Sequence, residues 1–260
     1  DMCISSGVGV VTPIDKDAPE ELLETLFRKA DIEAVICGAK YLTAIRKAAA
    51  NCELLKTVIT IDRKVEGFKF WDEIEAAGHR IVQGGKYFSE SVMFDEDTEK
   101  KIESLIPLAP LHNAAHLTCF RAFKQVLPNC PMIATFDTAF HQTMEPEDYT
   151  FPIPYELSEK YDIRRYGAHG TSHKYLSLEA EKYLKDTKSK RIISCHIGSG
   201  ASITAINNGK CIATSMGLTP LGGIMMGTRT GDMDPSVFNY VVSVTGKSAE
   251  EVYQMFNKKS

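Results

Sequence analysis

Short β-branched runs alternate with amphipathic segments in the first part of the chain. The spacing of apolar positions predicts helices over residues 19–30 and 42–50 and strands over residues 7–11, 33–37 and 57–61. Strands separated by helices in this way pair in parallel through βαβ crossovers. We therefore expect a small parallel α/β unit at the N-terminus.

The pattern and the composition change near Gly78, where we place a boundary between residues 1–77 and residues 78–260. Beyond it, a tight Asn-Gly turn at Asn208-Gly209 joins two strand-like runs into an antiparallel hairpin, so the sheet of this domain is expected to be mixed. The remaining periodic segments predict helices over residues 97–106 and 116–126 and strands over residues 132–137, 191–197, 202–206 and 211–215, with a proline-rich loop over residues 146–154.

Composition restricts the class of protein. The chain has 260 residues, of which 43% are apolar, and a formal charge of −4, so we expect a globular protein without a nucleic-acid or membrane partner. No apolar run approaches the roughly 20 residues of a membrane helix, and no signal peptide is recognisable, which favours the cytoplasm. The seven cysteines include no CxxC pair, so we interpret them as reduced thiols.

A glycine-bracketed turn follows the apolar run over residues 191–197. Gly198 and Gly200 enclose Ser199, and a second strand-like run begins at Ser202. Glycines here permit backbone angles at which several N–H groups converge on a phosphate. The alternative is an ordinary hairpin turn.

Two basic residues stand between glycines. Arg229 lies in the loop over residues 226–235, where its guanidinium can fork onto phosphoryl oxygens. His169 opens a helix-like segment, whose N-terminal N–H groups favour an anion, and the imidazole can donate to a transferring phosphoryl group. The alternatives are a solvated loop arginine and a helix-capping histidine.

Three further residues are candidates for substrate contacts. Asp137 ends an apolar strand, where α/β sheets place functional groups, although it can equally cap the next turn. Arg80 can hold a carboxylate in a bidentate pair. His112 follows a proline-fixed turn and can approach a carboxylate or phosphate.

Taken together and in order, these segments resemble the acetate kinases, the acetokinase family of the actin-like ATPase superfamily. The matching strings are GHRIVQGGKYFSESV, LAPLHN, PMIATFDTAFHQTM, RRYGAHGTSHKY, HIGSGASITAINNGK, TSMGLTPLGGIMMGTRTGDMDP and NKKS. The resemblance implies a partial actin-like, ribonuclease H-like fold with a mixed sheet, incomplete at both ends. It also implies ATP and Mg²⁺ as cofactors and a homodimer if the dimer surface is intact.

The resemblance assigns roles to the candidate residues. Arg80 and Arg229 would clamp the carboxylate and the transferring phosphoryl group, His169 would stabilise the transition state with His112 nearby, and Asp137 would be the catalytic aspartate, placing carboxylate or magnesium. The nucleotide phosphates would be touched by His196, Ile197, Gly198, Ser199 and Gly200.

In that family an apolar pocket holds the acetate methyl group, and the matching positions are Val82, Leu111, Ala168 and Pro220. Ala168 replaces the family's phenylalanine, so we expect a wider pocket that admits propionate or longer acids.

Other positions depart from the family pattern. Ser199 replaces an asparagine, Gln83 a histidine and Gly222 a glutamate. The family's opening strand and everything after NKKS, including its adenosine-binding loops and a magnesium-ligating glutamate, have no counterpart in this sequence.

Residues 1–77 lack the acetokinase motifs and weakly resemble the early α/β part of an adenylate-forming acyl-CoA synthetase. Three functions therefore stay open: a kinase that makes an acyl phosphate, a non-catalytic fragment that binds carboxylate or phosphate or dimerises, and an acyl-CoA synthetase-type ligase.

Overall fold

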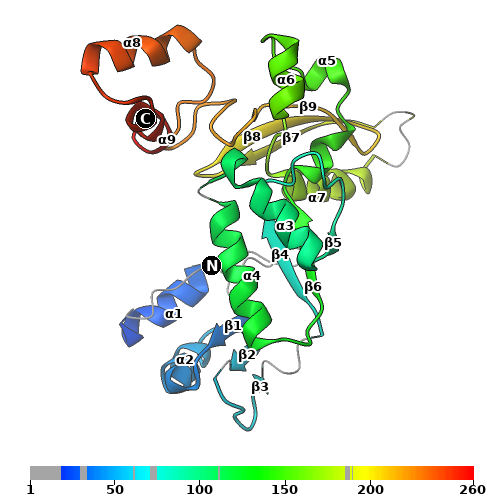
Figure 1. Cartoon of the computed structure of the whole chain (residues 1–260). Coiled ribbons are helices and arrows are strands. Elements are labelled where there is room, and N and C mark those ends of the chain that lie inside the picture. The colour runs from blue at the N-terminus through cyan, green and yellow to red at the C-terminus, as the bar shows by residue number, and fades with distance from the viewer. Residues whose placement is uncertain are drawn as a thin grey trace.

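The structure is a computed structural model, and it describes residues 19–29, 34–60, 62–70, 75–110, 112–184, 188 and 190–260 (Figure 1). The strand expected over residues 7–11 lies outside the described residues.

The N-terminal segment forms the expected parallel α/β unit. Helices α1 (Glu20–Lys29) and α2 (Leu42–Ala49) accompany strands β1 (Ala34–Cys37), β2 (Thr57–Thr60) and β3 (Lys69–Phe70), which pair in parallel in the order β1-β2-β3. Their apolar faces share a cluster that contains Phe27, Leu42 and Ile45. The boundary near Gly78 stays a prediction, supported by the fact that this cluster comprises only residues from positions 23–68.

A mixed sheet forms the centre of the molecule. Strand β4 (Ala77–Ile81) pairs in parallel with β6 (Met132–Phe136), and β5 (Val92–Met93) pairs antiparallel with β6. Helices α3 (Glu96–Ser104) and α4 (Asn113–Val126) accompany it, and the core includes Ile81, Leu117 and Phe136. This sheet confirms the mixed α/β prediction and aligns the ends of β4 and β6.

Helix α4 begins three residues before the predicted start. Asn113 is fully buried; its Oδ1 accepts from the backbone N–H of Gln83, and its Nδ2 donates to the Gln83 carbonyl. Residues 112–116 therefore lie close to the end of β4, and His112 is the N-cap residue of the helix.

The predicted hairpins form, but their strands do not join the mixed sheet as expected. They make a separate, purely antiparallel sheet of β7 (Arg191–Ile197), β8 (Ala201–Asn207) and β9 (Lys210–Thr214). Asn208 and Gly209 both have positive φ, at 48° and 76°, as a tight Asn-Gly turn requires. Helix α7 (Gly170–Glu181) packs against β7. Figure 1 shows this sheet and the N-terminal unit at opposite ends of the molecule.

The region expected to be a proline-rich loop, residues 146–154, contains one short helix, α5 (Pro146–Tyr149). A 3-10 segment (Ala139–Thr143) precedes this region, and α6 (Tyr155–Tyr161) follows it, with Pro154 as its N-cap residue. Pro146 is the first residue of α5. At this position a backbone N–H has no partner within the helix, so proline costs no hydrogen bond, and its fixed φ suits the helix. Here the prolines begin helices rather than exclude them.

The C-terminal end is helical. Helix α8 (Pro235–Thr245) leads to α9 (Ala249–Lys258), which starts with a capping box between Ser248 and Glu251. Within the ranges described, none of the helices combines the length and the apolar character needed to cross a membrane.

Candidate functional site

Arg80 and Asp137 come from neighbouring parallel strands. Arg80 lies opposite Thr135, and Asp137 follows the last residue of β6. Arg80 Nε donates to Asp137 Oδ1 at 2.9 Å, and its Nη2 forms an ion pair with Oδ2. The two contacts fix the plane of the guanidinium, while the Arg80 side chain remains 31% exposed.

The carboxylate of Asp137 is fully buried and surrounded by donors. Besides Arg80, the hydroxyl of Thr171 donates to Oδ1 at 3.1 Å and the backbone N–H of His169 donates to Oδ2 at 3.3 Å. Burial alone would raise the pKa of Asp137, but the charge and hydrogen bonds of Arg80, with His169, hold it below its usual range. Asp137 is therefore ionised and holds two other site residues in place.

His169 occupies an unusual backbone conformation just before α7. Its φ of 60° is left-handed, a region that few non-glycine residues adopt. The conformation is held because the Gly170 N–H donates to the Asp137 carbonyl at 2.9 Å. The imidazole stacks on His196 with ring centroids 4.0 Å apart, and Nδ1 lies 2.9 Å from Ser202 Oγ. Strain of this kind is typical of functional sites.

Arg229 and His169 converge at Gly200. A Cβ atom placed on Gly200 would stand 3.4 Å from Arg229 Nη1 and 3.4 Å from His169 Nε2. Arg229 Nη1 donates to the Pro220 carbonyl at 3.1 Å, and among the described residues Arg229 forms no ion pair. A half-buried guanidinium without a carboxylate partner beside an imidazole is suited to an anion.

Gly198 and Gly200 were expected to let several backbone N–H groups converge on a phosphate, but the structure gives them a different role. Neither Gly198 nor Gly200 has a positive φ, and the Gly198 N–H donates to the Gly200 carbonyl at 3.0 Å. That N–H is already engaged. Gly200 is needed instead for close approach, because a side chain there would occupy the space between Arg229 and His169.

The rest of the proposed nucleotide loop is only partly directed at this site. His196 faces α7, where its Nδ1 lies 3.0 Å from Ser172 Oγ. Because side chains alternate along a strand, the side chain of the next residue, Ile197, points away, and it is 69% exposed. The side chain of Ser199 is exposed, and its carbonyl accepts from the Gly227 N–H at 3.4 Å.

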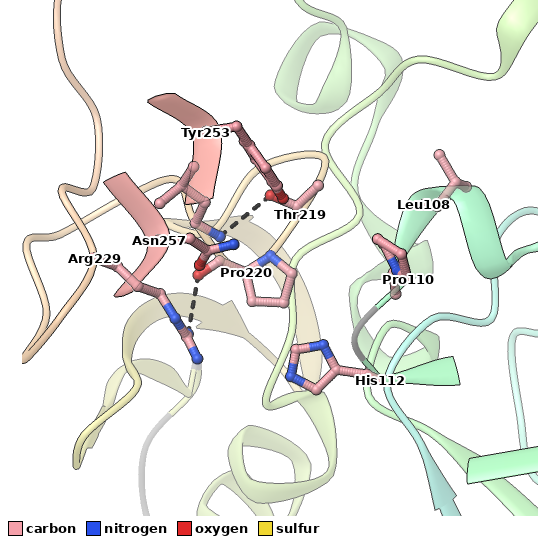
Figure 2. A pocket seen from close by; sticks show the side chains of 10 residues that line it. Leu108, Pro110, His112, Thr219, Pro220, Arg229, Tyr253 and Asn257 are labelled. Atoms are coloured by element: carbon pink, nitrogen blue, oxygen red, sulfur yellow. Dashed lines mark hydrogen bonds between the residues drawn. The ribbon is translucent and has the colours of Figure 1, made fainter. Parts of the chain in front are cut away.

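A small cavity, open to solvent, lies beside Arg229. Figure 2 shows the imidazole of His112 and the guanidinium of Arg229 on opposite sides of it, with Pro220 between them. Its other described lining residues include Tyr253 and Asn257 of α9. The cavity thus lies between the segment that leads into α4, the loop that carries Pro220 and Arg229, and helix α9.

Of the four apolar pocket positions, Pro220 lines the cavity, whereas Val82 and Ala168 are not among its described lining residues. Val82 is buried, with 5% exposed. Ala168 is 2% exposed and packs in a cluster with Met216 and Met226, which fill the space on that side. Leu111 lies outside the described residues.

The histidines of the site are neutral near pH 7. The pKa of His169 is lowered to about 4, chiefly by burial and then by the nearby His196; Asp137 opposes this shift, and Arg80 and Arg229 add to it. Burial, and then Arg229 and Arg80, lower the pKa of His112. The positive charge of the site therefore comes from its two arginines, and the imidazoles act as neutral hydrogen-bonding groups.

The sequence model of the acetokinase family matches residues 10–260. The chain belongs to the acetokinase family. The match extends further towards the N-terminus than the motifs, which begin at Gly78.

Individual acetokinases agree with this assignment. The chain is 50% identical over 203 residues to the acetate kinase of Caldanaerobacter subterraneus subsp. tengcongensis, covering 78% of this chain and 51% of that protein. A propionate kinase structure from Francisella tularensis has a TM-score of 0.69 at 44% identity and covers 85% of this chain and 52% of its own. The Porphyromonas gingivalis acetate kinase structure has a TM-score of 0.68 at 47% identity and covers 73% and 48%. The chain therefore spans about half the length of these acetokinases.

The sequence analysis did not identify three residues of this candidate site: Thr171, His173 and Ser202. Thr171 donates to Asp137, and Ser202 lies between the rings of His169 and His173, 2.9 Å from Nδ1 of the first and 2.8 Å from Nε2 of the second. His169 and His173 are four positions apart at the start of a helix, and this spacing placed them on one face. Ser202 lies on a strand about 30 residues further along the chain, and no sequence spacing indicated that it would contact these histidines.

The described part of this acetokinase chain does not fit a resident Mg²⁺ ion. Within it, no three histidine, cysteine or acidic side chains converge. Both oxygens of Asp137 already accept from Arg80, Thr171 and His169. Direct coordination of a metal by Asp137 would therefore displace the donors that hold the site together.

Proposed function

We propose that this chain provides the acceptor and phosphoryl half of a site for ATP-dependent phosphoryl transfer to acetate or another short-chain carboxylate, giving acyl phosphate and ADP. The observation that carries the proposal is the convergence of Arg229, His169 and the Arg80–Asp137 pair around Gly200 and the adjoining cavity. Phosphoryl transfer depends mainly on such positioning and on electrostatic stabilisation.

The reaction brings two anions together, which the arginines make feasible. One carboxylate oxygen of the acceptor attacks the γ-phosphorus of ATP, and the bond between this phosphorus and the β–γ bridging oxygen breaks. ADP leaves with that oxygen, and no proton is transferred. Arg229 would bind phosphoryl oxygens, Arg80 would orient the carboxylate, and His112 and His169 would act as neutral donors. Asp137 would act by fixing Arg80 and the backbone of His169.

Mg²⁺ would enter with the nucleotide as MgATP, where it neutralises phosphate charge. The nucleotide phosphates would approach the turn over residues 196–200, of which Gly200 directly adjoins Arg229 and His169.

Trapping acyl phosphate as its hydroxamate tests the proposal. Acetate, MgATP and hydroxylamine should give a signal with the full chain that Arg229→Ala reduces by about a hundredfold or more, the usual effect of losing a charge-stabilising donor. Arg121→Ala is the matched control, because this exposed arginine pairs with Glu99 and Glu103 on α3 and lies outside the site. Equal signals from the wild type and Arg229→Ala would refute the proposal.

A second candidate is anion binding without turnover. It is favoured by the engagement of both Asp137 oxygens with Arg80, Thr171 and the His169 N–H, because this carboxylate holds the site together. In that case inorganic phosphate would bind by calorimetry, Arg229→Ala would weaken the binding, and the hydroxamate assay would stay negative for the wild type.

We propose further that the acceptor pocket admits propionate. The propionate kinase among the similar structures supports this, whereas Ala168 gives no support, because Met216 and Met226 pack against it. Initial rates with acetate, propionate and butyrate test it, and a clear preference for acetate over both longer acids would refute it.

We also propose a homodimer. Helix α8 has no buried residue and exposes apolar side chains at Tyr240 (70%) and Val244 (60%), and Figure 1 shows it at the periphery. Exposed apolar side chains grouped on one helix favour association. Sedimentation velocity should give twice the monomer mass, and Tyr240→Asp should shift the chain to the monomer.

A further inference from the structure

Four polar side chains form a continuous line from the antiparallel sheet to the centre of the site. Ser194 Oγ lies 2.8 Å from His173 Nδ1, and His173 Nε2 lies 2.8 Å from Ser202 Oγ. Ser202 Oγ is in turn 2.9 Å from His169 Nδ1. Strand β7, helix α7 and strand β8 each contribute to this line, which ends at the imidazole beside Arg229.

Because both histidines are neutral, each ring has one N–H donor and one acceptor nitrogen. Burial lowers the pKa of His169 to about 4 and that of His173 to about 3. Each serine hydroxyl also has a single proton. Three arrangements make all of these hydrogen bonds: every proton is directed towards the site, every proton is directed away from it, or Ser202 accepts from both rings. In the third arrangement the proton of the fully buried Ser202 has no acceptor among the described residues, so the two directional arrangements are left to compare.

The direction away from the site leaves a buried donor without an acceptor. In that case His169 Nδ1–H donates to Ser202, Ser202 donates to His173 Nε2, and His173 Nδ1–H donates to Ser194. The hydroxyl proton of Ser194 then needs another acceptor, but Ser194 is 4% exposed, and its Oγ has no second hydrogen-bond partner among the described residues.

The direction towards the site uses every buried proton. Ser194 donates to His173 Nδ1, His173 Nε2–H donates to Ser202, and Ser202 donates to His169 Nδ1. Ser202 and His173 are fully buried, so no water competes for these bonds. Native structures rarely leave such groups unpaired, which decides between the two directions.

We propose that Ser194, His173 and Ser202 are positioning residues that fix His169 as the Nε2–H tautomer. The Nε2 atom is the one that lies 3.4 Å from a Cβ position on Gly200, as does Arg229 Nη1. The N–H therefore points into the space beside the arginine. The consequence for catalysis rests on the proposed function: a neutral imidazole would donate a hydrogen bond to a phosphoryl oxygen there without adding charge.

Nitrogen-15 NMR of the histidine-labelled full chain at pH 7.5 tests the tautomer without any turnover, and His169→Gln and His173→Gln assign the two rings. Both rings should show a protonated Nε2 and an unprotonated Nδ1 that accepts a hydrogen bond. A protonated Nδ1 on either ring overturns the proposal, whatever the outcome of the kinase assay.

Ser202→Ala should move the His169 Nδ1 resonance towards that of a nitrogen without a hydrogen bond. Ser172→Ala is the matched control, because that hydroxyl contacts His196 and leaves His169 Nδ1 bonded. If the kinase is active, Ser202→Ala should lower kcat about tenfold with KM for acetate unchanged, as expected when one positioned hydrogen bond is lost. An unchanged His169 Nδ1 resonance in Ser202→Ala would overturn the proposal even if the variant is fully folded.

Discussion

At the scale of single residues, the Arg80–Asp137 pair combines a structural role with the proposed function. A buried carboxylate is costly unless it is paired, and Asp137 has no exposed surface. Its other donors are one hydroxyl and one backbone N–H, so Arg80 supplies the compensating positive charge. The same pair sets the position of the guanidinium.

Arg80→Ala should lower the free energy of unfolding by about 3 kcal/mol, because it leaves the buried Asp137 charge without its partner. Urea denaturation measures the change. The exposed ion pairs of Arg121 are the comparison, and Arg121→Ala should cost less than about 1 kcal/mol. Equal costs for the two variants would mean that the Asp137 carboxylate is not held by Arg80.

Gly200→Ala should reduce phosphate affinity at least about tenfold with little change in melting temperature. The new methyl group stands at ordinary contact distance, 3.4 Å from Arg229 and His169, so it fills the anion space without a severe clash. Gly198→Ala is the control, since a Cβ there approaches only the Gly200 carbonyl. Calorimetry with inorganic phosphate measures the two affinities. Equal phosphate affinities of Gly200→Ala and Gly198→Ala would contradict the prediction.

The buried histidines predict a loss of stability in acid. The folded pKa values of His116, His141 and His169 are about 4 and that of His173 about 3, each lowered chiefly by burial from about 6.5. Their contribution is complete above pH 6.5 and is lost as the pH falls towards 4, since the unfolded chain binds more protons there. The slope is on the order of 1.4 kcal/mol per pH unit for each histidine. Urea denaturation between pH 7 and 4.5 gives the free energy of unfolding as a function of pH. This free energy should fall less steeply with pH in His116→Gln than in the wild type. An identical slope in the two proteins would contradict the lowered pKa of His116.

At the scale of elements, the spacing of apolar residues predicted correctly those strands and turns that depend on local sequence alone. The strand over residues 191–197 and the Asn208-Gly209 turn were predicted correctly, because alternation and positive φ are local properties. Helices α5 and α6 were missed, since proline favours both loops and the first turn of a helix. The helix start at Asn113 depends on bonds to Gln83, which lies 30 residues away.

The two faces of the β7–β8 hairpin should respond differently to truncation. Ile206 is 1% exposed and packs inward, so Ile206→Ala should cost about 2–5 kcal/mol. Ile197 is 69% exposed, so Ile197→Ala should change the free energy of unfolding by no more than about 0.5 kcal/mol. Thermal or urea unfolding that ranks Ile197→Ala as the more damaging change would contradict this packing.

At the scale of the whole molecule, the site is assembled from segments that lie far apart in the chain. Arg80, His112, Asp137, His169 and Arg229 were singled out from sequence because each stood in a motif with a chemical reason, and the structure brings them to one region. The serine–histidine line could not be predicted in the same way. It depends on how α7 lies across β7 and β8, which no motif encodes.

The central claim is that Arg229 and His169 act on one anion. A double-mutant cycle with Arg229→Ala, His169→Ala and the double variant, using the affinity for inorganic phosphate, measures this directly. Residues that share a ligand should show a coupling energy of about 0.5–3 kcal/mol. Losses that add to within about 0.3 kcal/mol would show that the two side chains act independently and would contradict the account.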